Sequence, residues 1–137
     1  MGIQTSAAST SRDDTAQIAA LMQQAGRAFQ AGKFDRLAAI LEQVLEINPD
    51  HTGALYNRGI LHRDKNELYG AEMCFRRALK LDPDMIDAYQ ALGDLLFNVK
   101  HLLPAAKIYE LALERAPNHL PLLHNLAKAR RYYARRH

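Results

Sequence analysis

Apolar residues recur at helical spacing in seven segments of this chain, and glycine, proline or short polar residues separate the segments. In the first segment one helical face carries Ile18, Leu21, Met22, Ala25 and Phe29. This period of about 3.6 residues predicts an amphipathic helix that begins near Asp13 or Asp14 and ends at Gly32. The same pattern predicts six further helices, at about 34–47, 52–65, 68–81, 86–99, 102–115 and 120–135.

Three prolines divide the predicted helices into pairs, and each proline is followed by Asp or Asn. Proline cannot continue a helix, and an Asp or Asn after it can cap the next one. Asp50 is therefore predicted to cap the helix that starts at 52. His51 and His119 occupy equivalent positions in the connecting loops, which indicates a loop role for both rather than metal binding.

The chain repeats itself with a period of 34 residues. The window 52–85 is marked by Leu55, Gly59, Ala71, Phe75, Ala78 and Pro83. The matching positions after it hold Tyr89, Gly93, Ala105, Tyr109, Ala112 and Pro117, and those before it hold Leu21, Ala25, Leu37, Leu41, Val44 and Pro49. A period of this length in a helical sequence indicates a solenoid, in which each helix pair needs a neighbour to bury its apolar faces.

These residues resemble the signature of the tetratricopeptide repeat family over about residues 18–119. The resemblance implies an all-α, right-handed superhelix of three helix pairs, with repeats at 18–51, 52–85 and 86–119. A capping helix at 120–135, with Lys and Arg on its outer side, is expected to cover the end of the stack. The domain is expected to span 13–137, after a disordered polar tail at 1–12.

Small residues inside the repeats predict close helix packing. In the third repeat Gly93 is expected to face Ala105, and Tyr109 to fill the gap toward the next helix pair. The second repeat carries the same residue types at the corresponding positions, so the same contacts are expected there.

The composition is that of an ordinary globular chain, with 48% apolar and 24% charged residues, but the charge is uneven. The net charge is +3, and residues 120–137 contain five basic side chains and no acid: Lys128, Arg130, Arg131, Arg135 and Arg136. A basic end can attract nucleic acid, although it is more often the solvated face of a last helix. Nucleic-acid binding through this helix is kept as an alternative to protein binding.

No sequence motif of a catalytic, cofactor or metal site is present, so no such site and no enzyme activity are predicted. The single cysteine, Cys74, excludes a disulfide framework within the chain and is expected to be a small apolar residue. No apolar run is long enough to span a bilayer, so stable membrane insertion is not expected. A cytoplasmic location is expected.

In the family that the chain resembles, the first helix of each pair lines a concave surface that binds peptides or partner helices. The resemblance places these residues of the chain on that surface: Met22, Phe29, Tyr56, Asn57, Ile60, Arg63, Gln90, Asp94, Phe97, Asn98, His124, Asn125, Lys128 and Arg131. Their amides can bridge a peptide backbone, and their aromatic rings can anchor apolar side chains. The predicted function is a non-catalytic protein-interaction module, a scaffold or adaptor, that is a monomer or a weak homo-oligomer.

One subclass of the family binds the acidic C-termini of cytosolic chaperones through basic and amide residues. Of the five matching positions here only Asn57 agrees, and Asp87 stands where a lysine is expected, which argues against that activity. The other alternative is that the chain is the repeat segment of a larger enzyme, such as a glycosyltransferase or methyltransferase.

Overall fold

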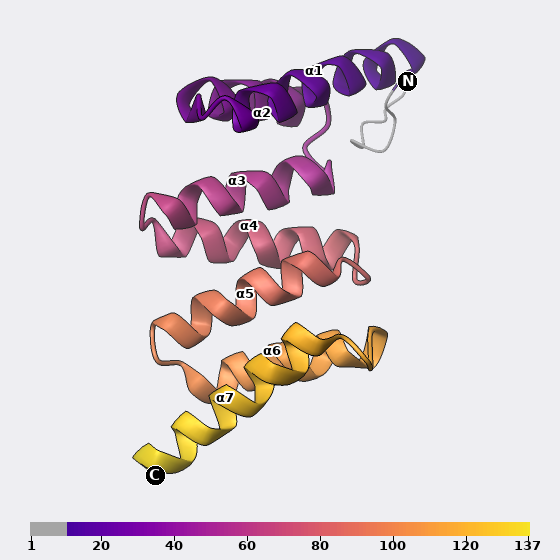
Figure 1. The fold of residues 1–137 in the computed structure, drawn as a ribbon. Coiled ribbons are helices and arrows are strands. Elements are labelled where there is room, and N and C mark those ends of the chain that lie inside the picture. The colour runs from indigo at the N-terminus through magenta and orange to yellow at the C-terminus, as the bar shows by residue number, and fades with distance from the viewer. Residues whose placement is uncertain (1–10) are drawn as a thin grey trace, which may run out of the picture.

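The computed structural model describes residues 11–137, which form seven α-helices and no strand (Figure 1). The helices are α1 (Arg12–Gln30), α2 (Phe34–Ile47), α3 (Thr52–Asp64), α4 (Leu68–Leu81), α5 (Ile86–Asn98), α6 (Leu102–Arg115) and α7 (Leu120–Arg136). The seven predicted helices are thus confirmed, with ends that differ by no more than two residues. Residues 1–10 of the predicted tail lie outside the described residues.

Helix α1 starts at Arg12, slightly before the predicted start at Asp13 or Asp14. Ser11 is its N-cap: the Ser11 hydroxyl oxygen accepts a hydrogen bond from the Asp14 amide at 3.0 Å. The Asp14 carboxylate in turn accepts from the Ser11 amide at 3.4 Å. This reciprocal pair satisfies two amides that the first helical turn leaves without partners, so the helix begins at Arg12.

Histidines cap α3 and α7, and the prediction that Asp50 caps α3 was wrong. His51 Nδ1 accepts from the Ala54 amide at 3.0 Å, and His119 Nδ1 accepts from the Leu122 amide at 3.3 Å. Burial lowers the pKa of the His51 imidazole, which favours the neutral ring whose nitrogen can accept. Asp50 instead accepts from Arg77 of α4 at 2.6 Å and ties the loop to the following repeat.

Each repeat glycine lies against an aromatic ring of its own pair, a contact that the predicted glycine–alanine packing did not include. A Cβ on Gly59 would lie 2.6 Å from Cε1 of Phe75, and a Cβ on Gly93 would overlap the ring of Tyr109. Both rings are fully buried. The aromatic residues therefore fill the interior of their own helix pair, and the glycines make room for them.

The helices stack as successive layers, from the indigo α1–α2 pair to the yellow α7, so that α1 and α7 lie at opposite ends of the stack (Figure 1). Each helix packs mainly on its neighbours in sequence, while α3 also touches α5 and α5 touches α7. The first helices of successive pairs therefore line one face of an all-α superhelix. Two clusters form the core, one within α1–α3 and the other from α4 to α7.

The last helix covers the end of the stack with one face only. Leu122, Leu126 and Ala129 are buried against the preceding pair. The outer side is not purely basic as expected, because Leu120 is 75% exposed and Leu123 is 42% exposed. The helix thus closes the core but leaves apolar side chains in solvent.

Candidate binding groove

Three neighbouring hollows line the face formed by α1, α3, α5 and α7, and together we call them the groove. The first hollow joins α1, the start of α2 and α3, the second joins α3 and α5, and the third joins α5, α6 and α7. The second and third share Asp94. Side chains far apart in sequence are therefore brought onto one continuous surface.

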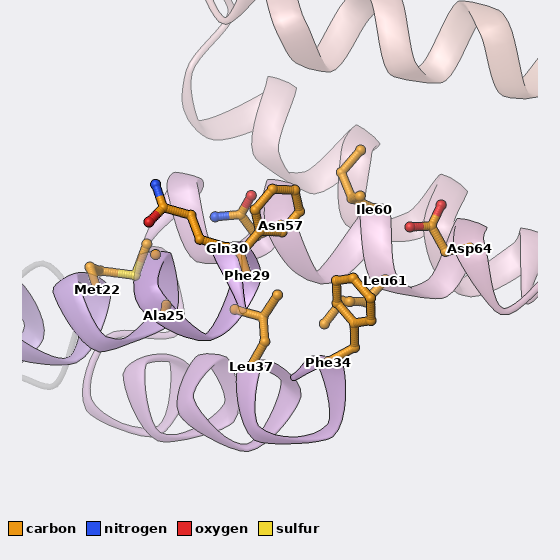
Figure 2. Close-up of a pocket in the computed structure, with 11 residues that line it drawn as sticks. Met22, Ala25, Phe29, Gln30, Phe34, Leu37, Asn57, Ile60, Leu61 and Asp64 are labelled. Carbon is orange, nitrogen blue, oxygen red and sulfur yellow. The ribbon is translucent and has the colours of Figure 1, made fainter. Parts of the chain in front are cut away.

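The first hollow is mainly apolar and encloses about 300 Å³ (Figure 2). Its aromatic residues are Phe29 of α1 and Phe34 of α2, whose ring centroids lie 6.2 Å apart in an edge-to-face arrangement. They are 58% and 46% exposed, unusually high for phenylalanine. Asn57, Ile60 and Asp64 of α3 also line this space (Figure 2). The hollow can take one large apolar side chain, with polar groups at its rim.

The second hollow is polar and smaller, about 190 Å³. It is lined by Tyr56, Arg63, Asp87, Gln90, Ala91 and Asp94. Burial, and then the nearby Asp87 carboxylate, raise the pKa of the Tyr56 hydroxyl, so this group remains a hydrogen-bond donor at neutral pH. Donors and acceptors of both kinds are therefore available to a bound main chain.

Asp94 links three helices at the border between the second and third hollows. Its Oδ1 accepts a hydrogen bond from the Tyr109 hydroxyl of α6 and another from Asn125 Nδ2 of α7, the latter at 3.2 Å. Burial and this carboxylate raise the pKa of Tyr109, so the phenol stays protonated and keeps donating. Asp94 therefore holds the groove wall together as well as facing the groove.

The third hollow encloses about 210 Å³ and has Phe97 and Lys128 in its lining, and a basic and aromatic cluster extends from these two residues along α7. The Lys128 ammonium lies 4.8 Å from the ring centroid of Phe97, and the Tyr132 ring lies 5.2 Å from that of Phe97. Arg135 lies 5.7 Å from the Tyr132 ring centroid. Cation–π contacts of this kind hold the cations in place near the groove. This end of the groove can attract a carboxylate.

Twelve of the fourteen residues predicted for the binding surface line one of the three hollows. They are Met22, Phe29, Asn57 and Ile60 in the first, Tyr56, Arg63, Gln90 and Asp94 in the second, and Phe97, Asn98, Asn125 and Lys128 in the third, with Asp94 shared. The other two, His124 and Arg131, are exposed on α7 and line none of these hollows.

The sequence argument missed Phe34 and Leu37, because it placed only first helices on the surface. Both come from the first turn of α2 and reach the apolar hollow beside Phe29. The tight turn at Gly32, which has a φ of +72°, brings this turn of α2 back beside the end of α1. The sequence signal for this contact was Phe34, a second phenylalanine close after Gly32, the glycine that ends α1.

Several features bear on other kinds of site. Cys74 is half-buried, and burial raises the pKa of its thiol, which makes a reactive thiolate unfavourable. Residues 11–137 contain no group of three or more His, Cys, Asp or Glu side chains placed to hold a metal ion. Within the same residues, no helix combines the length and apolar character that a bilayer crossing requires.

Comparison with known proteins matches two consecutive segments of the chain to tetratricopeptide repeat models, at residues 53–85 and 86–119. Human protein O-mannosyl-transferase TMTC3 is 34% identical over 90 residues, which are 65% of this chain and 10% of that protein. This chain thus spans about a tenth of the length of that relative.

Solved structures share the architecture. An O-GlcNAc transferase mutant of Thermobaculum terrenum is 30% identical, with a TM-score of 0.77 over 88% of this chain and 23% of that one. The first TPR domain of Spaghetti (RPAP3), bound to an HSP90 peptide, has a TM-score of 0.77 and 24% identity over 85% of this chain and 95% of that one. With the 34-residue period, the glycine–aromatic pairs and the stacked helices, these matches show that the chain belongs to the tetratricopeptide repeat family.

Proposed function

We propose that this chain is a non-catalytic protein-interaction module that binds a peptide segment, extended or helical, in the groove. The observation that carries the proposal is the row of three hollows along the first helices. The first is mainly apolar, the second combines Arg63 with Asp87 and Asp94, and the third carries Lys128 beside two asparagines. The RPAP3 domain in its peptide complex has the same fold, and its 24% identity supports the fold alone. The proposal therefore depends on the groove of this chain.

The groove favours a ligand with an apolar end and an acidic end. An aromatic or leucine side chain fits the hollow beside Phe29 and Phe34, since burying exposed apolar surface there is favourable. A carboxylate fits beside Lys128. We expect a dissociation constant of roughly micromolar, because ordering a flexible segment offsets much of the contact energy.

The groove does not suit a ligand that is acidic throughout, such as those of the chaperone-binding subclass. Asp87 lines the second hollow where that subclass uses a lysine, and Met22 and Gly26 line the first where it uses basic and amide residues. A run of carboxylates would meet Asp87 and Asp94 in the second hollow. We propose that the acidic end of the ligand is confined to the α7 side.

The test uses peptides selected from a random display library against the intact chain. Phe29→Ala with Asn57→Ala should weaken binding at least tenfold, and Lys128→Glu should weaken it in a salt-dependent way. Tyr56 is left unchanged in these variants because its ring packs on buried Phe75, at a centroid distance of 5.8 Å. Loss of the Tyr56 ring would disturb the core. Arg136→Glu on the exposed end of α7 is the charge control.

Amide shifts on α1, α3, α5 and α7 should mark the bound peptide. Shifts confined to the second helices of the pairs, around Glu72, Arg76 and Glu110, would show that the groove is not the binding surface.

A second candidate is that the chain is the repeat segment of a larger glycosyltransferase. The similarity to the O-mannosyl-transferase and the O-GlcNAc transferase, each matched over a small part of its length, favours it. A full-length transcript decides between the two candidates. An open reading frame that continues into a transferase domain would support the second candidate, and a reading frame without such a domain would contradict it.

A further inference from the structure

The two junctions between successive repeats differ, although a shift of 34 residues superposes their helices in sequence. The junction of α2, α3 and α4 contains an open hollow of about 640 Å³. Its lining residues are Leu45, Pro49, Leu55, Arg58, Met73, Cys74, Arg76, Arg77 and Lys80. The residues 34 positions later, at the junction of α4, α5 and α6, are Leu79, Pro83, Tyr89, Leu92, Lys107, Ile108, Glu110, Leu111 and Glu114.

One replacement contributes to the open space. At the second junction Tyr89 is buried in the larger core cluster, and its hydroxyl donates to the Pro83 carbonyl oxygen at 2.7 Å. At the first junction the same position is Leu55, which belongs to neither core cluster. Leucine has neither the ring nor the hydroxyl of tyrosine, so the first junction has open space at the place that the Tyr89 ring occupies in the second.

Charge changes at the same positions. Arg58 replaces Leu92, Arg76 replaces Glu110 and Lys80 replaces Glu114. Arg76 pairs with Glu72 at 2.8 Å and Arg77 with Asp50 at 2.6 Å, which offsets part of the positive charge. Within residues 11–137 neither Arg58 nor Lys80 forms an ion pair. The lining of the hollow is therefore basic overall, and its apolar part comes from Leu45, Leu55 and Met73, of which Met73 is 52% exposed.

This hollow lies away from the groove. On α3 the groove residues are Tyr56, Asn57 and Ile60, whereas the hollow uses Leu55 and Arg58 from the other side of the helix. Most of its other residues come from α4, a second helix.

We propose that the α2–α3–α4 hollow is a second binding site, for an acidic peptide segment that inserts one tyrosine side chain. The inserted ring would occupy the space that Tyr89 fills at the next junction, and its hydroxyl would reach the Pro49 carbonyl as that of Tyr89 reaches Pro83. Carboxylates beside the tyrosine would meet Arg58 and Lys80. This site is independent of the proposed groove function.

The test uses a short, end-capped peptide with one tyrosine between runs of glutamate, titrated by calorimetry and by amide shifts into the full chain. Binding should shift the amides of Leu55, Arg58 and Cys74 and leave those around Phe29 unmoved. The same peptide with alanine in place of tyrosine should bind about tenfold more weakly or worse, because it lacks the ring that is buried. Equal binding of the two peptides would overturn the proposal, because it would show that only the basic side chains bind the peptide.

The decisive variant is Leu55→Tyr, which copies the second junction into the first. It should fold with an unchanged or higher melting temperature and lose the peptide, since its own ring takes the position proposed for the inserted tyrosine. Undiminished binding by the folded variant would contradict the proposal. If this variant does not fold, Arg58→Leu with Lys80→Glu, which copies Leu92 and Glu114, should weaken binding at least tenfold, and unchanged binding would equally overturn it.

The groove variant Phe29→Ala with Asn57→Ala separates the two sites. It should bind the glutamate–tyrosine peptide as the natural chain does. Peptides selected for the groove should in turn bind Leu55→Tyr normally. A negative result for one proposed site would therefore not contradict the proposal for the other site.

Discussion

The backbone of Gly93 lies directly against the ring of Tyr109, and this contact sets the distance between α5 and α6. The ring is fully buried, and Asp94 fixes its hydroxyl, so it cannot swing away. Gly93→Ala should destabilise the fold by about 1–3 kcal/mol through overpacking, and Gly93→Leu by more.

Gly26 provides the matched control for this substitution. An added Cβ there meets nothing within 4 Å. Gly26→Ala in the exposed helix should stabilise the chain by up to about 1 kcal/mol through helix propensity. The two alanine variants should thus move the denaturation midpoint in opposite directions, and shifts of the same sign would refute the packing argument.

Tyr109 donates a hydrogen bond to Asp94, whereas the same positions of the preceding repeat hold Phe75 and Ile60, two apolar residues of the larger core. Tyr109→Phe alone should cost about 1 kcal/mol, because the half-buried carboxylate loses a donor. The double variant Tyr109→Phe with Asp94→Ile copies two residues of the preceding repeat and should recover only part of that loss, because Asn125 also loses its bond to Asp94. Urea denaturation of the single and double variants measures the coupling, and additive losses would show that the two residues act separately.

The His51 cap should make stability depend on pH. Burial lowers the pKa of His51 from its usual value of 6.5, so below that value the unfolded chain binds more protons at this site than the folded chain does. The stability from this cap is therefore full above about pH 6.5 and is lost as the pH falls from there through the lower folded-state pKa. A fall in melting temperature between pH 7.5 and pH 5.5 is the expected result.

His51→Asn is the control for that experiment. Asparagine is a strong N-cap that does not titrate in this range, so the variant should keep the helix start and lose part of the pH dependence. The informative quantity is the difference between the two proteins at each pH, since other groups titrate equally in both. A difference that does not change with pH would exclude the role assigned to His51.

Removal of residues 120–137 should uncover the apolar face of the last pair. Leu122 is fully buried, and Tyr109 and Ala112 lie in the same core cluster, so the truncated stack would present a contiguous apolar surface. Sedimentation should show self-association, and the melting temperature should fall. Removal of 134–137 alone deletes only exposed residues and should change neither. A monomeric and equally stable truncated chain would show that α7 is not a cap.

The sequence by itself determined the number of helices, their ends and the order in which they pair. These features depend on local chemistry: apolar residues at helical spacing, proline and glycine between the helices, and a period of 34 residues. The resemblance to the family also predicted Met22, Asn57, Gln90 and Asn125 for the binding surface, and each of them lines one of the three hollows.

Only the tertiary structure decided what each side chain touches. Gly93 lies against Tyr109, because the large ring needs the space that a missing Cβ leaves. His51 rather than Asp50 caps α3, because Arg77, 27 positions later in the sequence, holds the carboxylate. Leu55 and Tyr89 occupy the same place in the repeat, but whether that place is open or filled depends on volume and charge contributed by three helices at once.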